Sequence, residues 1–271
     1  GSHTLSLPVL LVFGVPLLEL LVAEKSRKLG IPYVVYCLVN YLCDTGTYHL
    51  IYRIPSLITP SAIATEDLFT KPGSASDVEE LRDLFDTQDR GLCTLIALDF
   101  SYPPSPPFPN LTRNAATGTV DLGGVDPYNA SDLLKLYFRE LPEPLLTYEL
   151  YNDLISLKGS KESSHGYIEG LRELLAKLPL PNRTLLQYIV HFLCRITFCA
   201  EVNRMSPSNI ALVFGPELID PGMTAPDFSP MQYSFGNKFR REITLESHLM
   251  FGKIQRLLQT LIENYVDIFF D

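Results

Sequence analysis

Apolar residues recur at every third or fourth position along most of the chain, which is the spacing that places them on one face of an α-helix. Residues 16–29 form the first such stretch, and Gly30 follows as a stop signal. Pro32 suits the first turn of a second helix, because its missing N–H costs nothing there. The following residues, 33–44, are almost all apolar. The N-terminal part of the chain is therefore predicted to begin with two consecutive helices.

Capping signals mark two further helices. Ser76 can cap a helix that runs to Phe85, with acidic residues in the first turn, where the positive end of the helix dipole favours them. Asp126 repeats this arrangement, with Pro127 at the first position of a helix whose apolar stripe reaches Leu141. Both helix starts thus have a physical reason beyond the apolar pattern.

The pattern as a whole predicts an all-α fold of roughly nine helices. No alternating strand pattern and no hairpin turn competes with it. The expected helices span residues 16–29, 33–44, 76–85, 127–141, 145–157, 167–178, 182–198, 207–213 and 245–269.

Two stretches, residues 56–72 and 87–125, interrupt the helical pattern. Both are expected to be long loop insertions, because the helices on either side belong to one set in a single domain of residues 4–271. Residues 1–3 (Gly-Ser-His) are expected to be the remnant of an expression tag. Deleting residues 56–71 is expected to leave a folded protein, since long loops cost little to close or remove.

The second insertion contains a proline cluster from Pro103 to Pro109. Such a cluster favours a stiff surface loop. A ligand for an adaptor module that reads polyproline is the alternative interpretation.

Composition narrows the class of protein. The hydrophobic content of 46% is ample for a core, and no apolar run approaches the roughly 20 residues needed to span a bilayer. We therefore expect a cytoplasmic protein with no direct membrane insertion, recruited to membranes, if at all, by segments outside this chain.

The net charge of −9 argues against nucleic acid as a partner. The five cysteines, with no Cys-x-x-Cys pair, are expected to be reduced core residues.

Three basic residues are candidates for a functional site. Arg53 follows an apolar segment, and nothing nearby in the sequence neutralises it, although a lone arginine is usually a solvated or salt-bridged surface residue. Lys135 and Arg139 lie one helical turn apart, where like charges destabilise by roughly 0.2–0.5 kcal/mol. Glu140, Glu143 or solvent could compensate for this repulsion. The functional alternative is that an anionic partner, or a carbonyl-lined pocket beside Arg53, compensates for the repulsion. Arg53, Lys135 and Arg139 would then form a small cationic site that binds a phosphate.

Asn203 and Asn209 flank a helix start, where both amides can cap. The histidines lack metal-ligand spacing, and no phosphate-binding loop, dinucleotide fingerprint or nucleophile elbow is present in the sequence. We therefore expect no metal and no cofactor, and no hydrolysis of a nucleotide by this chain alone.

Four motifs follow one another along the chain: Tyr52-Arg53-Ile54-Pro55, Gly73-Ser74-Ala75, Lys135-Leu136-Tyr137-Phe138-Arg139, and Asn203-Arg204-Met205 through Val213-Phe214-Gly215-Pro216. In this order they resemble the RhoGAP domain, the GTPase-activating domain for Rho-family GTPases. The likeness extends over nearly the whole chain, and it implies a single all-helical domain of roughly nine helices.

The resemblance implies a GTPase activator that binds a GTP-loaded Rho- or Rac-type small GTPase and accelerates its hydrolysis of GTP. Arg53 is then the catalytic arginine finger, inserted in trans. Lys135 and Arg139 are the basic pair that supports the finger loop and the contact with the switch regions. Asn209 lies on the GTPase-facing surface. Asn203, the earlier asparagine of the same motif, is a further candidate for a binding or supporting role.

Two departures from the family pattern keep an alternative open. Leu50 stands where the family usually has a glycine, and residues 56–71 separate the arginine run from Gly73. The alternative is a catalytically impaired RhoGAP-like interaction module, which binds a GTPase or another protein without stimulating hydrolysis.

Overall fold

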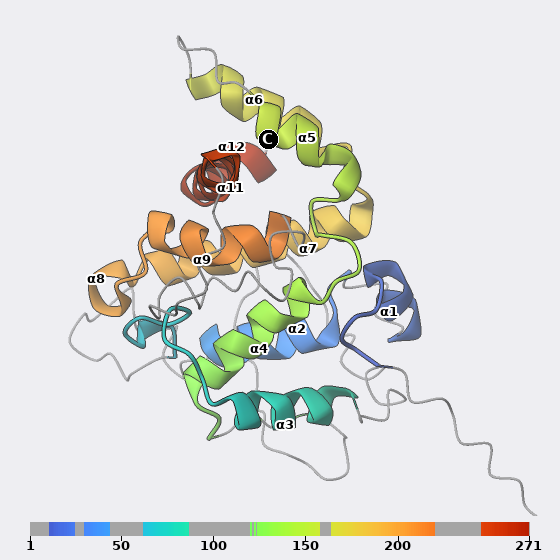
Figure 1. Ribbon diagram of the computed structural model, residues 1–271, viewed down its shortest axis with the longest axis vertical. Coiled ribbons are helices and arrows are strands. Elements are labelled where there is room, and N and C mark those ends of the chain that lie inside the picture. Colours follow the sequence, from blue (N-terminus) through green and yellow to red (C-terminus); the bar gives the residue numbers. More distant parts are fainter. Residues whose placement is uncertain are drawn as a thin grey trace, which may run out of the picture.

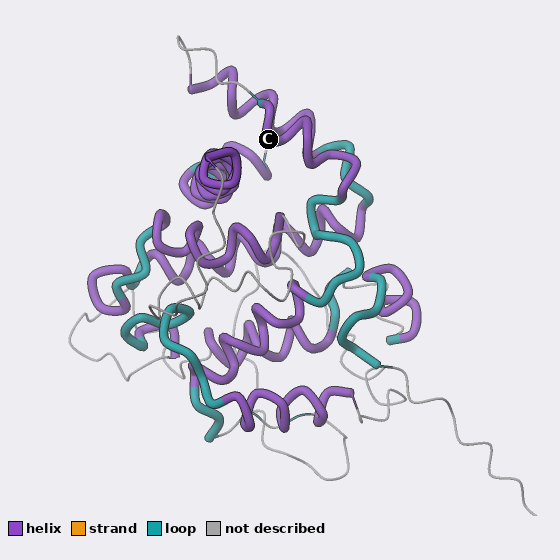
Figure 2. The backbone as a smooth tube through the Cα atoms, in the orientation of Figure 1, coloured by secondary structure: helices purple, strands orange, loops and turns teal. Residues whose placement is uncertain are grey.

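The computed structural model describes residues 11–24, 30–43, 62–86, 120, 122, 124–157, 164–219 and 245–270. Within these ranges the chain forms helices joined by turns and loops, with no β-strand (Figures 1 and 2). The all-α prediction is confirmed.

Nine of the described α-helices have seven or more residues, in agreement with the roughly nine expected from the sequence. Two short helices, α8 and α12, and the 3-10 helix η2 were not expected as separate elements. In chain order the elements are α1 (Leu17–Ala23), α2 (Tyr33–Cys43), η2 (Ala62–Ala64), α3 (Ala75–Asp86), α4 (Pro127–Arg139), α5 (Tyr148–Ser156), α6 (Ser164–Leu175), α7 (Leu180–Thr197), α8 (Ala200–Asn203), α9 (Pro207–Ile219), α11 (Leu245–Glu263) and α12 (Tyr265–Phe269).

Helix α4 lies at the centre of the half of the molecule that carries the candidate site. It packs against α2 and α3 on one side and against α9 on the other. Helix α9 in turn packs along α11, and α11 also contacts α5 and α7 (Figure 1). The buried apolar residues of these helices form one continuous hydrophobic cluster. The helices that carry the sequence motifs therefore share a core.

The helix boundaries follow the capping signals only in part. Asp126 caps α4 as predicted, because its carboxylate accepts a hydrogen bond from the Tyr128 backbone N–H at 2.9 Å. Helix α3 begins at Ala75, so Ser76 lies inside its first turn and is not the cap. The Ser74 carbonyl accepts the first bond of this helix, from the Val78 N–H at 3.0 Å.

The segment of residues 62–72, which the sequence assigned to a loop insertion, is packed into the core. Ile63, Leu68 and Phe69 are buried members of the main hydrophobic cluster. The Phe69 ring makes edge-on contacts with Phe214 (centroids 4.8 Å apart) and Phe192 (6.1 Å). The expectation that residues 56–71 could be deleted without harm is therefore wrong for the part from residue 62 onward, because the deletion would remove core side chains.

No helix in the described ranges is long and apolar enough to cross a membrane.

Four cysteines lie in the described ranges, and each is a free thiol: Cys37, Cys43, Cys194 and Cys199. Burial raises the pKa of the Cys194 thiol to about 11, so that it stays protonated at neutral pH. Cys93 and the proline cluster from Pro103 to Pro109 lie outside the described residues.

We predict that Phe69→Ala lowers the free energy of unfolding by about 3–5 kcal/mol, because it leaves a cavity between two phenylalanine rings. Chemical denaturation of the purified chain measures the loss. Phe198→Ala is the matched control: Phe198 is 87% exposed, so removal of its ring should change stability by less than about 0.5 kcal/mol. Equal effects of the two substitutions would contradict the placement of residues 62–72 in the core.

Candidate functional site

Four of the five candidate site residues lie in the described structure, and Arg53 does not. Lys135 and Arg139 project from successive turns of α4, Asn203 ends α8, and Asn209 lies in the first turn of α9. These elements surround the segment of residues 62–72, where the described chain resumes after the run that contains Arg53. We call residues 62–72 the return segment, because the described chain resumes there with side chains that are buried in the core.

Lys135 attaches the return segment to helix α4. Its side chain is only 7% exposed, and Nζ donates a 2.8 Å hydrogen bond to the Phe69 carbonyl oxygen. Asp132 Oδ1 lies 2.8 Å from the same Nζ, as an ion pair that lacks hydrogen-bond alignment. A buried ammonium requires such compensation, because loss of its hydration would otherwise cost several kcal/mol. The charge of Lys135 is thus balanced by buried partners and does not contribute to an open cationic surface.

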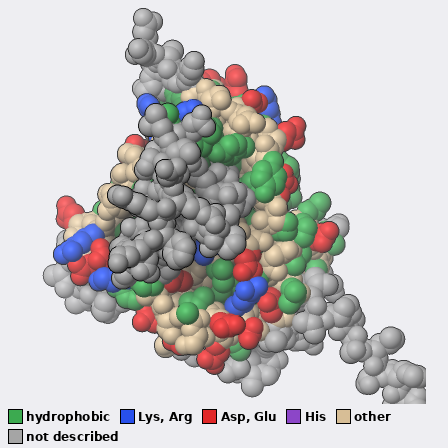
Figure 3. Space-filling view, viewed as in Figure 1, with side chains coloured by type: hydrophobic (Ala, Val, Ile, Leu, Met, Phe, Trp, Pro, Cys, Tyr) green, Lys and Arg blue, Asp and Glu red, His purple; other side chains and the backbone are tan. Residues whose placement is uncertain are grey.

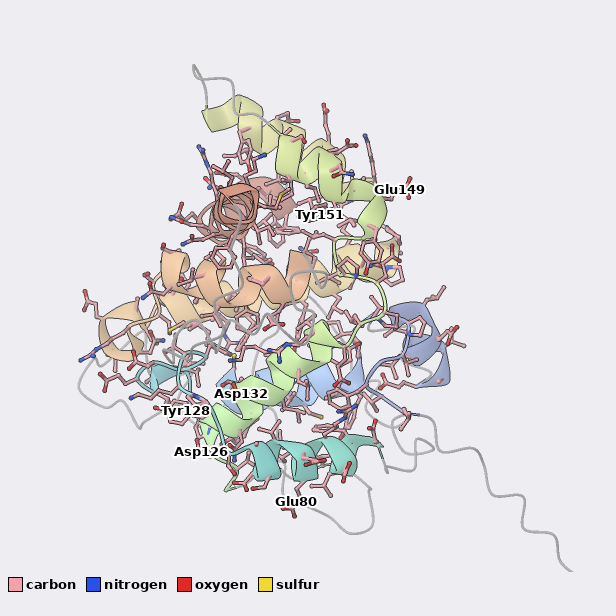
Figure 4. All side chains as sticks on the ribbon, in the orientation of Figure 1. Glu80, Asp126, Tyr128, Asp132, Glu149 and Tyr151 are labelled. Carbon is pink, nitrogen blue, oxygen red and sulfur yellow. The ribbon has the colours of Figure 1, made fainter. Side chains whose placement is uncertain are left out.

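The Gly73-Ser74-Ala75 motif is held by the same helix. Asp132 Oδ2 accepts from the Gly73 N–H at 2.7 Å, and Asn129 Oδ1 accepts from the Ser74 N–H at 2.8 Å. A Cβ atom at position 73 would lie 2.4 Å from Asn129 Oδ1, so glycine is required by this close approach. The motif therefore marks the point where the chain docks on α4 (Figure 4, which labels Asp132).

Hydrogen bonding also affects the acid beside this motif. Hydrogen bonds from Ser74, Ser76 and Asn129 to the Asp77 carboxylate lower the pKa of Asp77. The carboxylate therefore stays charged in the first turn of α3, where the helix dipole favours it.

Arg139 has a buried counter-ion on α9. Its Nε and Nη2 donate to Oε2 and Oε1 of Glu217 at 3.0 and 2.7 Å. Neither of the acids suggested by the sequence takes this place: Glu140 pairs with Arg82 at 2.8 Å, and Glu143 accepts from the Tyr148 N–H. Burial lowers the pKa of Arg139, but the hydrogen bonds and charge of Glu217, with other nearby carboxylates, outweigh burial and raise it. The guanidinium is thus permanently charged and fixed in place.

Asn203 is a buried anchor rather than only a cap. Its Nδ2 donates to the carbonyl oxygens of Ile63 (2.7 Å) and Ile196 (2.9 Å), and its Oδ1 accepts from the Met205 N–H at 2.8 Å. The Asn203 carbonyl also accepts from the Asp67 N–H at 2.8 Å. One asparagine therefore ties α7 and the turn before α9 to two points of the return segment.

Asn209 lies on the surface beside this anchor. Its backbone N–H donates to Ser206 Oγ at 3.2 Å, and its Nδ2 donates to the Arg204 carbonyl at 2.8 Å. Arg204 has a left-handed backbone (φ 60°) and pairs with Glu66 of the return segment at 2.8 Å. Asn209 is exposed, so its amide is accessible to a partner, in contrast to the buried amide of Asn203.

Charge is unevenly spread around the site. In Figure 3 acidic side chains gather at the edge of the molecule formed by α3, below α4. Tyr128, labelled on α4 in Figure 4, reaches from this side to the return segment, and its hydroxyl donates to the Glu66 carbonyl at 2.8 Å. Among the described residues, no group of three or more His, Cys, Asp or Glu side chains could hold a metal ion.

Sequence reasoning missed four residues of this arrangement. Asp132 could have been found, because it lies three residues before Lys135 on the same helical face. Asn129 and Glu217 gave no local signal, since their partners lie far away along the chain. Phe69 was missed because residues 62–72 have no helical periodicity.

The sequence model of the RhoGAP domain matches residues 108–222, which contain Lys135, Arg139, Asn203 and Asn209. The fold agrees over a wider range: human Rho GTPase activating protein 15 has a TM-score of 0.63 at 18% identity, over 96% of this chain and 92% of that one. At this identity the likeness shows the fold alone.

Two relatives extend the sequence match. Rho GTPase-activating protein 45 of Xenopus laevis is 36% identical over 172 residues, which are 55% of this chain and 14% of that protein. Rho GTPase-activating protein 24 of Homo sapiens is 33% identical over 179 residues, which are 65% of this chain and 20% of that protein. Residues 108–222 therefore match the RhoGAP domain, and the chain is homologous to Rho GTPase-activating proteins, which confirms the resemblance seen in the motifs. It spans a fifth or less of the length of these two relatives.

The two asparagines give a stability prediction. Asn203→Ala should lower the free energy of unfolding by about 1–3 kcal/mol, because it leaves buried carbonyl groups without their donor. Asn209→Ala should cost less than about 1 kcal/mol, since it removes one exposed hydrogen bond. Thermal and chemical denaturation of both variants decide the matter, and a larger loss for Asn209→Ala would contradict the assignment of Asn203 as the anchor.

Proposed function

We propose that this chain activates GTP hydrolysis by a GTP-loaded Rho- or Rac-type small GTPase, with Arg53 as an arginine finger inserted in trans. The observation that supports this most is the anchoring of the return segment. Arg53 lies midway in the sequence between Cys43, the last residue of α2, and Ile63, whose carbonyl is held by Asn203. A loop with both of its ends attached to the core can present an arginine at a defined place.

The chemistry requires an arginine of this kind. During GTP hydrolysis, charge develops on oxygens around the β- and γ-phosphates, and a guanidinium inserted by a second protein stabilises it. Such a finger is worth about 10³–10⁵ in rate, which corresponds to roughly 4–7 kcal/mol of barrier lowering. Lysine would substitute poorly, because it lacks the planar fork of donors.

Burial divides the other four residues between two proposed roles. Lys135 and Asn203 are buried and bound to the return segment, so they would support the finger loop from inside. Arg139 is partly exposed and Asn209 is exposed, so they would lie at the surface that meets the GTPase. Such an activator would act in the cytoplasm, with any membrane recruitment left to segments outside this chain.

The test is single-turnover GTP hydrolysis by a panel of purified Rho-family GTPases, with and without the chain. Arg53→Ala should remove most of the acceleration, about 10³-fold or more, and leave binding to the GTP-loaded partner nearly intact, because the finger acts mainly in the transition state. Arg183→Ala is the matched control, since Arg183 is an exposed arginine in the first turns of α7 and away from the proposed surface.

Loss of binding in parallel with activity in the Arg53→Ala variant would contradict the finger assignment. Retained binding with no acceleration by the unaltered chain would favour the second candidate, an interaction module without activating function. Leu50 and the long run between Arg53 and Gly73 are the sequence features that favour this candidate.

A further inference from the structure

Glu217 is the most deeply buried carboxylate at the candidate site. Its side chain is 1% exposed, whereas the side chain of its partner Arg139 is 33% exposed. A buried carboxylate needs a counter-charge and hydrogen bonds to remain ionised. Both carboxylate oxygens obtain these from the one guanidinium, in a bidentate pair.

The pair orients Arg139 in a defined way. Glu217 uses the Nε–H and one N–H of Nη2. Both N–H groups of Nη1 remain as donors that Glu217 does not use, and a guanidinium is planar, so fixing one edge fixes the direction of the other. The remaining donors belong to a side chain that is one-third exposed. A partner group can therefore meet an edge whose direction has already been set.

The stretch of α9 that carries Glu217 is closely packed. Two residues before it, Gly215 lies so close to α11 that an added Cβ would be 3.0 Å from the Ile254 side chain. Phe214 packs its ring on Phe69 of the return segment. The carboxylate that holds Arg139 thus belongs to the same stretch of α9 that helps to hold the return segment in place.

We infer that Glu217 is a positioning residue for the activating reaction: it presents the free edge of Arg139 to the GTPase and links that edge to the anchored return segment. This inference rests on the proposed function. Glu217 contacts no reacting group in it, and acts only through Arg139.

Glu217→Gln tests the inference, because glutamine keeps the size of the side chain but loses its charge and one acceptor oxygen. We expect the single-turnover rate at saturating activator to fall about tenfold, the effect of losing one charge-assisted hydrogen bond. Glu173→Gln, an exposed site on α6, is the matched control and should leave the rate unchanged. In the background of Arg139→Ala, Glu217→Gln should cause no further fall in rate.

Two readouts besides activity separate orientation from stability. The Nε–H resonance of Arg139 should be sharp and protected from exchange in the unaltered chain, and should lose this protection in Glu217→Gln. Glu217→Gln should also restore stability to Arg139→Ala, because that variant leaves a buried carboxylate unpaired, yet it should not restore the rate.

The outcomes are distinguishable. An unaltered Nε–H resonance together with an unchanged rate in Glu217→Gln would overturn the inference while the proposed function stands. An additive fall in rate in the double variant would show that Glu217 acts independently of Arg139, and would also overturn it. If the unaltered chain accelerates no GTPase of the panel, the proposed function fails, and the positioning role fails with it.

Discussion

The site depends on one buried contact, the hydrogen bond from the Lys135 ammonium to the Phe69 carbonyl. An ammonium that is almost fully withdrawn from water cannot be left without partners, so it holds its acceptor strongly. The acceptor belongs to a turn in which Phe69 has a left-handed backbone (φ 79°), which costs of order 1–3 kcal/mol for a residue with a side chain. Burial of the Phe69 ring between Phe192 and Phe214 and the bond to Lys135 together offset this strain.

The same principle is repeated around the return segment. Asn203 at the end of α8 and Tyr128 on α4 each donate a side-chain hydrogen bond to the backbone of the return segment. Asp132 accepts a hydrogen bond from the N–H of Gly73, the residue that follows this segment. Polar side chains in a helical protein usually point to solvent, and these instead replace the backbone partners that an irregular segment cannot supply for itself. An all-helical core can thereby hold a segment made of one short 3-10 helix and turns in one conformation, which is what a protein needs if it is to present a side chain on an adjoining loop.

The sequence predicted the regular part of this structure well and the irregular part poorly. Periodicity located the long helices, and Asp126 was correctly identified as a cap, because these signals are local. Helix α3 starts from Ser74, two residues before the predicted cap Ser76, since the backbone of Ser74 is fixed by Asn129 from another helix. The burial of the return segment has no local sequence signal, because it depends on rings and donors far away in the sequence. For the same reason, the motifs identified Lys135 and Arg139 but not the carbonyl and the carboxylate that hold them.

Hydrogen exchange at the return segment tests most directly whether it is a fixed anchor. The amide of Asp67 donates to the Asn203 carbonyl at 2.8 Å, and this bond should open only with the surrounding core. We expect peptides from residues 62–72 to exchange about as slowly as peptides from α4, and to lose this protection in Lys135→Ala. Exchange of residues 62–72 within seconds, while α4 stays protected, would show that the segment is not anchored and would contradict the structural basis proposed for the finger loop.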